Sequence, residues 1–325
     1  MSLTWRLLLA LLLAVAGHAG PAWAAIAQID HADVTGTAGG QAIALSDARL
    51  PYHWDRRHGA VGGQATFRLR VNVADPTQPL GLYIPRMGNT FAIRVNGDQF
   101  ASFGDVPANL YDDSAMEPRY FVVPPRLLLT DTVIEIDIGA IAARQAGLTA
   151  VTVGPEDEVY RRYQASHFAQ ITGARIVVVV SCVLGLLGLL LWFRQRDPAY
   201  LAYGAGELLW AVQTLRVLVE HAPLPWPWWG VIPLAAFNAA PPLLCRFALI
   251  IMGADKGRVA LMANALVLLA LPAALLTMLG GLLFLAPLFQ LFITITSVCM
   301  AWVVIRAAMR SNVHEKRILG VAVFL

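Results

Sequence analysis

Three residues in the first third of the chain have types and spacing that suit a metal site. His53, Asp55 and His58 lie within six positions of one another, and imidazole and carboxylate groups are ordinary zinc ligands. No second ligand cluster follows at a diagnostic spacing, so we interpret the three as a polar loop and predict neither a metal nor a cofactor. A second group of acidic residues beside glycine and proline is interpreted as solvated loop positions: Asp105, Asp112, Asp113 and Glu117.

Four aromatic side chains in the same region suit a sugar-binding platform, because flat rings pack against apolar ligand faces. They are Trp54, Tyr83, Tyr111 and Tyr120. Aromatic residues of β-rich domains also fill the core, and both interpretations stay open. The predicted partner is a small molecule, with carbohydrate as one class.

Two ionisable residues, Glu207 and Arg246, lie inside apolar segments. A charge in the hydrocarbon region costs at least a few kcal/mol when it is alone. We therefore predict that the two side chains face each other or share a polar network. A proton relay is the functional alternative, although a transporter is expected to carry more intramembrane charges.

The composition separates these residues into two environments. Hydrophobic residues make up 58% of the 325-residue chain and charged residues 14%, against about 45–50% and 25% in soluble domains. The excess lies after residue 173. The net charge is +3 and the basic residues are dispersed along the chain, so nucleic acid is not a predicted partner. The apolar second half predicts a lipid bilayer as a partner.

The first 24 residues resemble a secretory signal peptide. Arg6 supplies a positive start, Leu7 to Ala16 an apolar stretch, and Ala22-Trp23-Ala24 a cleavage pattern. The mature chain is then expected to begin at Ala25, and the alternative is an uncleaved anchor helix.

Residues 25–155 have the pattern of an antiparallel β-sandwich. Phe67, Leu69 and Val71 alternate with polar residues, which is typical of a half-buried strand. Similar segments recur at 80–84, 91–95, 121–123, 134–138 and 151–153. Asn96-Gly97 predicts a hairpin, since both residues tolerate positive φ. The cysteines all lie outside this domain, at Cys182, Cys245 and Cys299, so packing rather than disulfides must stabilise it.

The order of these segments resembles galactose-binding-like jelly rolls. The resemblance rests on Leu50-Pro51 with Trp54-Asp55, the strand Ala65 to Val73, the hairpin Phe91 to Gly97, Val123-Pro124-Pro125 and the strand Thr132 to Ile138. It implies a fold and names no ligand.

Residues 156–173 read as an amphipathic connector, and 174–325 as a transmembrane helical region with five complete spans and the start of a sixth at Ile318 to Leu325. The complete spans are expected at Ala174 to Phe193, Tyr200 to Val219, Trp229 to Met252, Val259 to Leu279 and Leu285 to Ile305. Every second loop is basic, which places the N-terminal domain outside the membrane. Trp226, Trp228 and Trp229 are interpreted as an interfacial aromatic belt.

The domain order, together with the segment Arg196 to Gly204 (RDPAYLAYG) that continues to Glu207 and Ala211, resembles the bacterial seven-transmembrane receptors with diverse intracellular signalling modules. The resemblance implies a multi-pass protein of the inner membrane with a periplasmic sensor, two further crossings after the fifth, and a cytoplasmic output domain. That output is expected to be a histidine kinase, acting as a homodimer on a response regulator, or alternatively a diguanylate cyclase.

No catalytic signature of either output occurs in these residues. His314 lies in a short basic loop and is not interpreted as a phosphoacceptor. Two further hypotheses stay open: a membrane-anchored carbohydrate-binding or transport-associated protein, and a binding subunit that pairs with a separate kinase.

Overall fold

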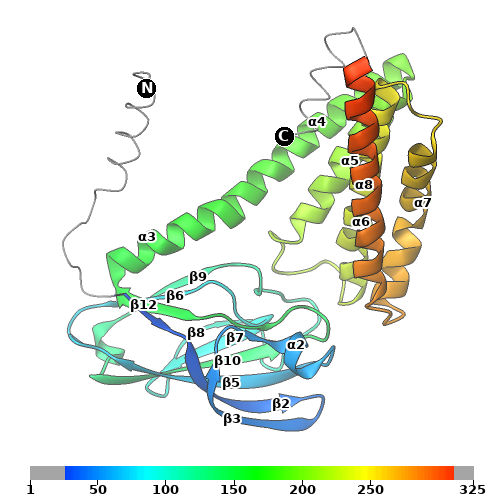
Figure 1. The fold of residues 1–325 in the computed structure, drawn as a ribbon. Coiled ribbons are helices and arrows are strands. Elements are labelled where there is room, and N and C mark those ends of the chain that lie inside the picture. The colour runs from blue at the N-terminus through cyan, green and yellow to red at the C-terminus, as the bar shows by residue number, and fades with distance from the viewer. Residues whose placement is uncertain (1–25, 311–325) are drawn as a thin grey trace, which may run out of the picture.

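The structure is a computed structural model that describes residues 26–310. The predicted signal peptide, the start of the sixth span and His314 lie outside the described residues. The described chain has two parts, a β-rich N-terminal domain and a bundle of helices, joined by one long helical segment (Figure 1).

Two antiparallel sheets form the N-terminal domain. The four-stranded sheet has the spatial order β1 (Ala27–Ile29), β12 (Val151–Pro155), β6 (Leu80–Ile84) and β9 (Arg119–Val123). The six-stranded sheet has the order β3 (Gln41–Arg49), β2 (His31–Ala38), β5 (Gly63–Asn72), β10 (Asp131–Ala140), β7 (Thr90–Val95) and β8 (Asp98–Phe103). The remaining elements are the short pair β4 (Tyr52–His53) and β11 (Gly147–Leu148), α2 (Trp54–His58) and the 3₁₀ turn η1 (Pro125–Leu127).

One apolar core lies between the two sheets. Phe67, Leu69 and Ile136 of the larger sheet and Leu82 and Val153 of the smaller one belong to a single buried cluster. On β5 these apolar residues alternate with exposed arginines, as the period of two predicts. The domain is therefore a β-sandwich.

Two glycine-containing turns set the register of the larger sheet. Asn96 and Gly97 have φ of 51° and 92° and join β7 to β8, which confirms the predicted hairpin. Gly39 and Gly40, with φ of 54° and 83°, join β2 to β3 in the same way. This second hairpin was not predicted, although its Gly-Gly pair is a recognised turn signal.

The connector forms a helix that continues into the first long apolar helix. It consists of α3 (Glu156–His167), a π-helical turn η2 (Phe168–Thr172) and α4 (Gly173–Gln195). Val159 of α3 is fully buried against the smaller sheet, where a Cβ at Gly81 would lie 2.8 Å from its side chain. The lack of a side chain at Gly81 thus lets α3 lie directly on the sheet.

The remaining helices form a bundle in which α5 packs against α4, α6 against α5, and α7 and α8 against α6 (Figure 1). They are α5 (Pro198–Leu215), α6 (Trp228–Ile251), α7 (Arg258–Met278) and α8 (Leu285–Arg310). Asp197 caps α5 by accepting a hydrogen bond from the Ala199 N–H at 2.8 Å, and Pro198 occupies the first helical position. The Asp-Pro pair of the receptor-like segment is thus a helix-start signal.

Four helical segments are long and apolar enough to cross a membrane: Glu156–Gln195, Trp228–Ile251, Arg258–Met278 and Leu285–Ala307. The sequence predicts a fifth at Tyr200 to Val219. There α5 ends at Leu215 after 18 residues, and polar Glu207 and Gln213 lower its hydropathy. A membrane crossing by α5 stays a prediction.

Candidate functional site

The loop between α5 and α6, residues 216–227, pairs with a loop of the sandwich; we call it the latch loop. Three backbone hydrogen bonds join the two loops, each with an N···O distance of 2.8 Å: the N–H of Asp113 donates to Glu220, that of Ala222 to Tyr111, and that of Trp226 to Leu110. The helix bundle therefore contacts the sandwich at a second place, apart from the covalent link through α3.

Arg119 of β9 is the central cation of this contact. Its guanidinium donates to the Glu220 carboxylate of the latch loop and lies 3.0 Å from Glu117. The same group lies 5.3 Å from the centre of the Phe103 ring. Burial lowers the pKa of Arg119, and the Glu117 carboxylate opposes this effect. The aromatic ring and two carboxylates stabilise the cation. Removal of the guanidinium would leave the Glu117 and Glu220 carboxylates close together without a counter-charge.

His221 adds a second polar contact. Its Nδ1 lies 2.6 Å from the Asp112 carboxylate, and its ring stacks on Phe103 with centroids 5.2 Å apart. Phe103 thus lies against both His221 and the Arg119 guanidinium, which joins the two contacts into one cluster.

A buried ion pair supports the sandwich side of the latch. Arg144, which is 7% exposed, donates from Nε to Asp113 Oδ2 at 2.8 Å. The Asn89 side chain donates to the other oxygen of Asp113 at 2.9 Å. The guanidinium lies 4.9 Å from the Trp226 ring centre, while the Trp226 indole donates to the carbonyl of Ala142 at 2.9 Å. Trp226 is therefore held by two loops of the sandwich.

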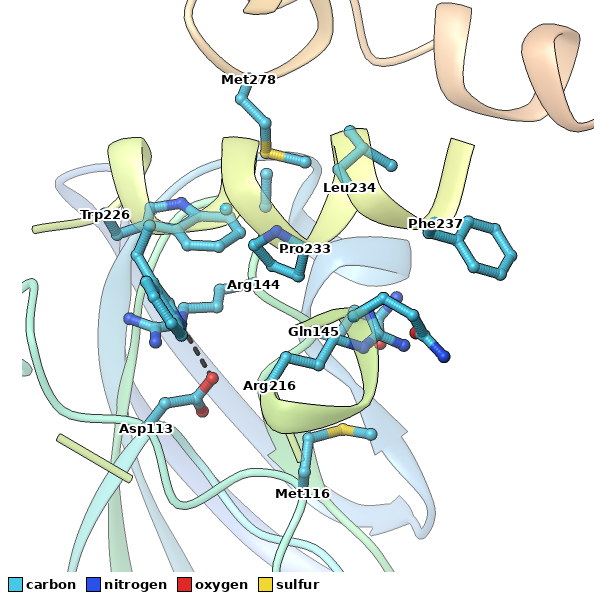
Figure 2. A pocket seen from close by; sticks show the side chains of 14 residues that line it. Asp113, Met116, Arg144, Gln145, Arg216, Trp226, Pro233, Leu234, Phe237 and Met278 are labelled. Carbon is cyan, nitrogen blue, oxygen red and sulfur yellow. Dashed lines mark hydrogen bonds and ion pairs between the residues drawn. The ribbon is translucent and has the colours of Figure 1, made fainter. Parts of the chain in front are cut away.

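A cavity of about 250 Å³ lies beside this ion pair, between the sandwich and the helices; we call it the junction cavity. Figure 2 shows Pro233, Leu234 and Phe237 of α6 on one side and Arg216 with Met116 on the other. It is the place where sandwich, latch loop and helices meet, which makes it the candidate functional site.

The structure separates the four aromatic residues of the predicted platform. Trp54 is fully buried in the sandwich core, and its indole donates to the Val61 carbonyl at 2.8 Å. Tyr83 and Tyr120 are neighbours on β6 and β9, but Tyr163 of α3 packs over both. Tyr111 is 48% exposed and lies in the loop that pairs with the latch loop. The sandwich core thus buries Trp54, and α3 covers Tyr83 and Tyr120, so these three rings do not form an open face for a sugar.

The residues considered for metal binding are also engaged elsewhere. His58 Nε2 lies 2.6 Å from the Tyr52 hydroxyl, and Asp55 accepts from the Gln145 N–H at 2.8 Å. Within residues 26–310 no group of three or more histidine, cysteine, aspartate or glutamate side chains is placed to hold a metal ion.

The interpretation of three acidic loop residues needs correction. Asp112 and Asp113, predicted to be solvated, are paired with His221 and Arg144, and Glu117 is paired with Arg119. Trp226 packs on Arg144, and its place in an interfacial belt stays a prediction. Charged and turn residues identify loops, but His221 lies 109 residues from Asp112 and Arg144 lies 31 from Asp113, so local patterns do not reveal these partners.

Glu207 and Arg246 lie on the adjacent helices α5 and α6, yet they form no ion pair with each other. The Arg246 guanidinium donates instead to the backbone carbonyl of Asp255, in the loop before α7, at 2.9 Å. A backbone oxygen at the end of the bundle thus accepts from one of the guanidinium N–H groups, and a direct Glu207–Arg246 pair is not part of this structure.

No protein-family model and no curated protein matches the chain. Among solved structures, it is similar to a GH2 β-galacturonidase from Eisenbergiella tayi, with 12% identity over 41% of this chain and 24% of that one and a TM-score of 0.32. A mutant β-glucuronidase 2 from Bacteroides uniformis gives 11% identity, coverage of 41% and 18%, and a TM-score of 0.30. A GH31 α-xylosidase from Xanthomonas citri is 10% identical over 42% of this chain and 16% of that one, with a TM-score of 0.27. The chain covers less than a quarter of each of these structures, and the similarity assigns it no activity.

Proposed function

We propose that this chain is the sensory and membrane part of a bacterial signalling receptor. The sandwich senses a small molecule outside the inner membrane, and the helices pass the change to a cytoplasmic output domain. The observation that supports this function is the double connection between the two parts. The sandwich is joined to α4 through the helix that begins at Glu156, and to α5 and α6 through the latch loop.

Two ordered links can transmit a displacement that a flexible linker would dissipate. A ligand that binds one arrangement of sandwich and latch more tightly would shift the helices toward that arrangement, by no more than its difference in affinity for the two states. The π-helical turn η2 lies where the connector meets α4. Such turns often occur at functional positions, and here it is a place where the helix can change its register.

In this proposal the sandwich is a galactose-binding-like jelly roll in the periplasm, and the helices are the multi-pass bundle of a homodimer. The output is a histidine kinase that acts on a response regulator, or alternatively a diguanylate cyclase. These assignments rest on the resemblance to seven-transmembrane receptors that the Asp197-Pro198 segment and the domain order carry. We keep carbohydrate as one proposed class of ligand for the sandwich, although the four aromatic residues do not form a binding platform for it.

The orientation can be tested by cysteine labelling of intact spheroplasts. In a variant without Cys182, Cys245 and Cys299, Arg70→Cys on β5 is expected to react with a membrane-impermeant maleimide. Arg196→Cys, between α4 and α5, is expected to react only after permeabilisation, because the basic loops face the cytoplasm. Both arginines are exposed.

Arg258→Cys, at the start of α7, is the matched control, since it lies in another basic loop and should behave as Arg196→Cys does. Labelling of Arg196→Cys in intact spheroplasts would place the output side outside the cell and contradict the receptor.

A further inference from the structure

The junction cavity has an unbalanced positive charge. Among its lining side chains, Arg144 and Arg216 face one carboxylate, that of Asp113. Arg144 is already paired with Asp113. Within the described residues, the Arg216 guanidinium forms no ion pair or hydrogen bond and is exposed at the end of α5. One arginine is thus available for one anionic group.

The rest of the lining is mostly apolar. It includes Trp226, Trp229, Leu234, Phe237 and Met278, and Arg144 packs on the Trp226 ring. Figure 2 shows Trp226 and Phe237 at the two ends of the α6 side, with Arg216 across from them. Gly230 makes room for Trp226, because a Cβ there would lie 2.6 Å from the indole ring. The cavity therefore combines one free cation with rings that suit a flat or branched apolar body.

The cavity has a volume of about 250 Å³, near the lower end of the range of small-molecule sites. A small organic acid or the head of a lipid suits a cavity of this size.

We propose that the junction cavity binds a small amphipathic monoanion, that is, one acidic group on a compact apolar body. The acidic group pairs with Arg216 as a charge-assisted hydrogen-bond acceptor, and the apolar body lies between Trp226 and Phe237. The inference deepens the proposed receptor function and rests on it. Its occupant would contact the Ala143–Gln145 loop of the sandwich and α6 at once, and so would bind the docked arrangement better than an undocked one.

The same chemistry has two sources, a free acid or an anionic lipid of the bilayer, and two arms of one experiment distinguish them. In the first arm, the full chain in phosphatidylcholine nanodiscs is titrated with fluorophenylacetate, and fluorine NMR line broadening reports binding. In the second, native mass spectrometry reports phosphatidylglycerol retained from mixed nanodiscs.

Binding in at least one arm is expected to weaken about tenfold or more in Arg216→Gln, since a charged hydrogen bond is lost. Arg216→Lys keeps the charge and should bind within a few-fold of the wild type. Arg70→Gln, an exposed arginine on β5, is the matched control and should bind as the wild type does.

Equal binding by the wild type and Arg216→Gln, or no binding in either arm, would overturn the inference. These outcomes concern the ligand site alone and are distinct from a failure of the proposed receptor function. If binding depends on Arg216 but the distance between spin labels at Arg196→Cys and Arg258→Cys does not change on binding, the ligand site is kept and the relay is contradicted.

Discussion

Replacing Arg119 by alanine is expected to undock the latch loop from the sandwich. The substitution removes the cation that lies between Glu117 and Glu220 and against Phe103. The three side chains are partly buried, with 22–30% of their surface exposed, so the cost lies between the roughly 0.2–1 kcal/mol of an exposed pair and the about 2–5 kcal/mol of a buried one. Amide hydrogen exchange in residues 110–113 and 217–226 should accelerate by about tenfold or more.

Hydrogen exchange with mass spectrometry on the full chain in nanodiscs measures this effect. Arg126→Ala is the matched control, because Arg126 is exposed on η1 and should leave the latch amides unchanged. The charge swap Arg119→Glu with Glu220→Arg should restore part of the protection. Wild-type exchange in Arg119→Ala would mean that the latch does not depend on this ion pair.

Replacing Gly204 by alanine is expected to destabilise the helix bundle. A Cβ at Gly204 would lie 2.8 Å from the carbonyl oxygen of Gly185 and 2.8 Å from the backbone nitrogen of Leu189. Both atoms belong to the backbone of α4, so the helices must separate rather than a side chain rotate. Overpacking of this kind costs about 1–3 kcal/mol, and close small-residue contacts are a main source of helix association in membranes.

Gly206→Ala on the same helix is the matched control. Its Cβ would meet the Leu244 side chain at 3.1 Å, and a flexible side chain can move. Thermal unfolding in detergent, followed by circular dichroism, should show a lower Tm for Gly204→Ala and nearly the wild-type Tm for Gly206→Ala. Equal Tm values for both variants would show that α4 and α5 are not as closely packed as described.

The sequence is informative wherever a pattern repeats within one element. The alternation on β5 and the Asn96-Gly97 turn follow from the two-residue period and from positive φ, and the structure has both. The apolar stretches predict five complete spans, and four helical segments are long and apolar enough to cross a membrane. The start of α5 is readable too, since Asp197 and Pro198 act within a single turn.

The latch was not predictable in this way. Asp112 and His221 are 109 residues apart, and Arg119 and Glu220 are 101 apart, so nothing local joins them. The aromatic platform fails for a related reason: a tyrosine on a strand looks the same whether a ligand or Tyr163 of α3 covers it. A feature that could have pointed to the latch is the set Glu220, His221 and Trp226, in a loop too short for a domain of its own.

The central claim is that the docked latch holds the helices in one arrangement. Pulsed electron–electron double resonance tests this. Spin labels are attached at Arg196→Cys and Arg258→Cys in a chain that lacks the three native cysteines, in nanodiscs. We expect Arg119→Ala to shift or broaden the distance distribution, and Arg126→Ala to leave it as in the parent. Identical distributions in all three proteins would show that the sandwich does not control the helices, and would contradict the proposed relay.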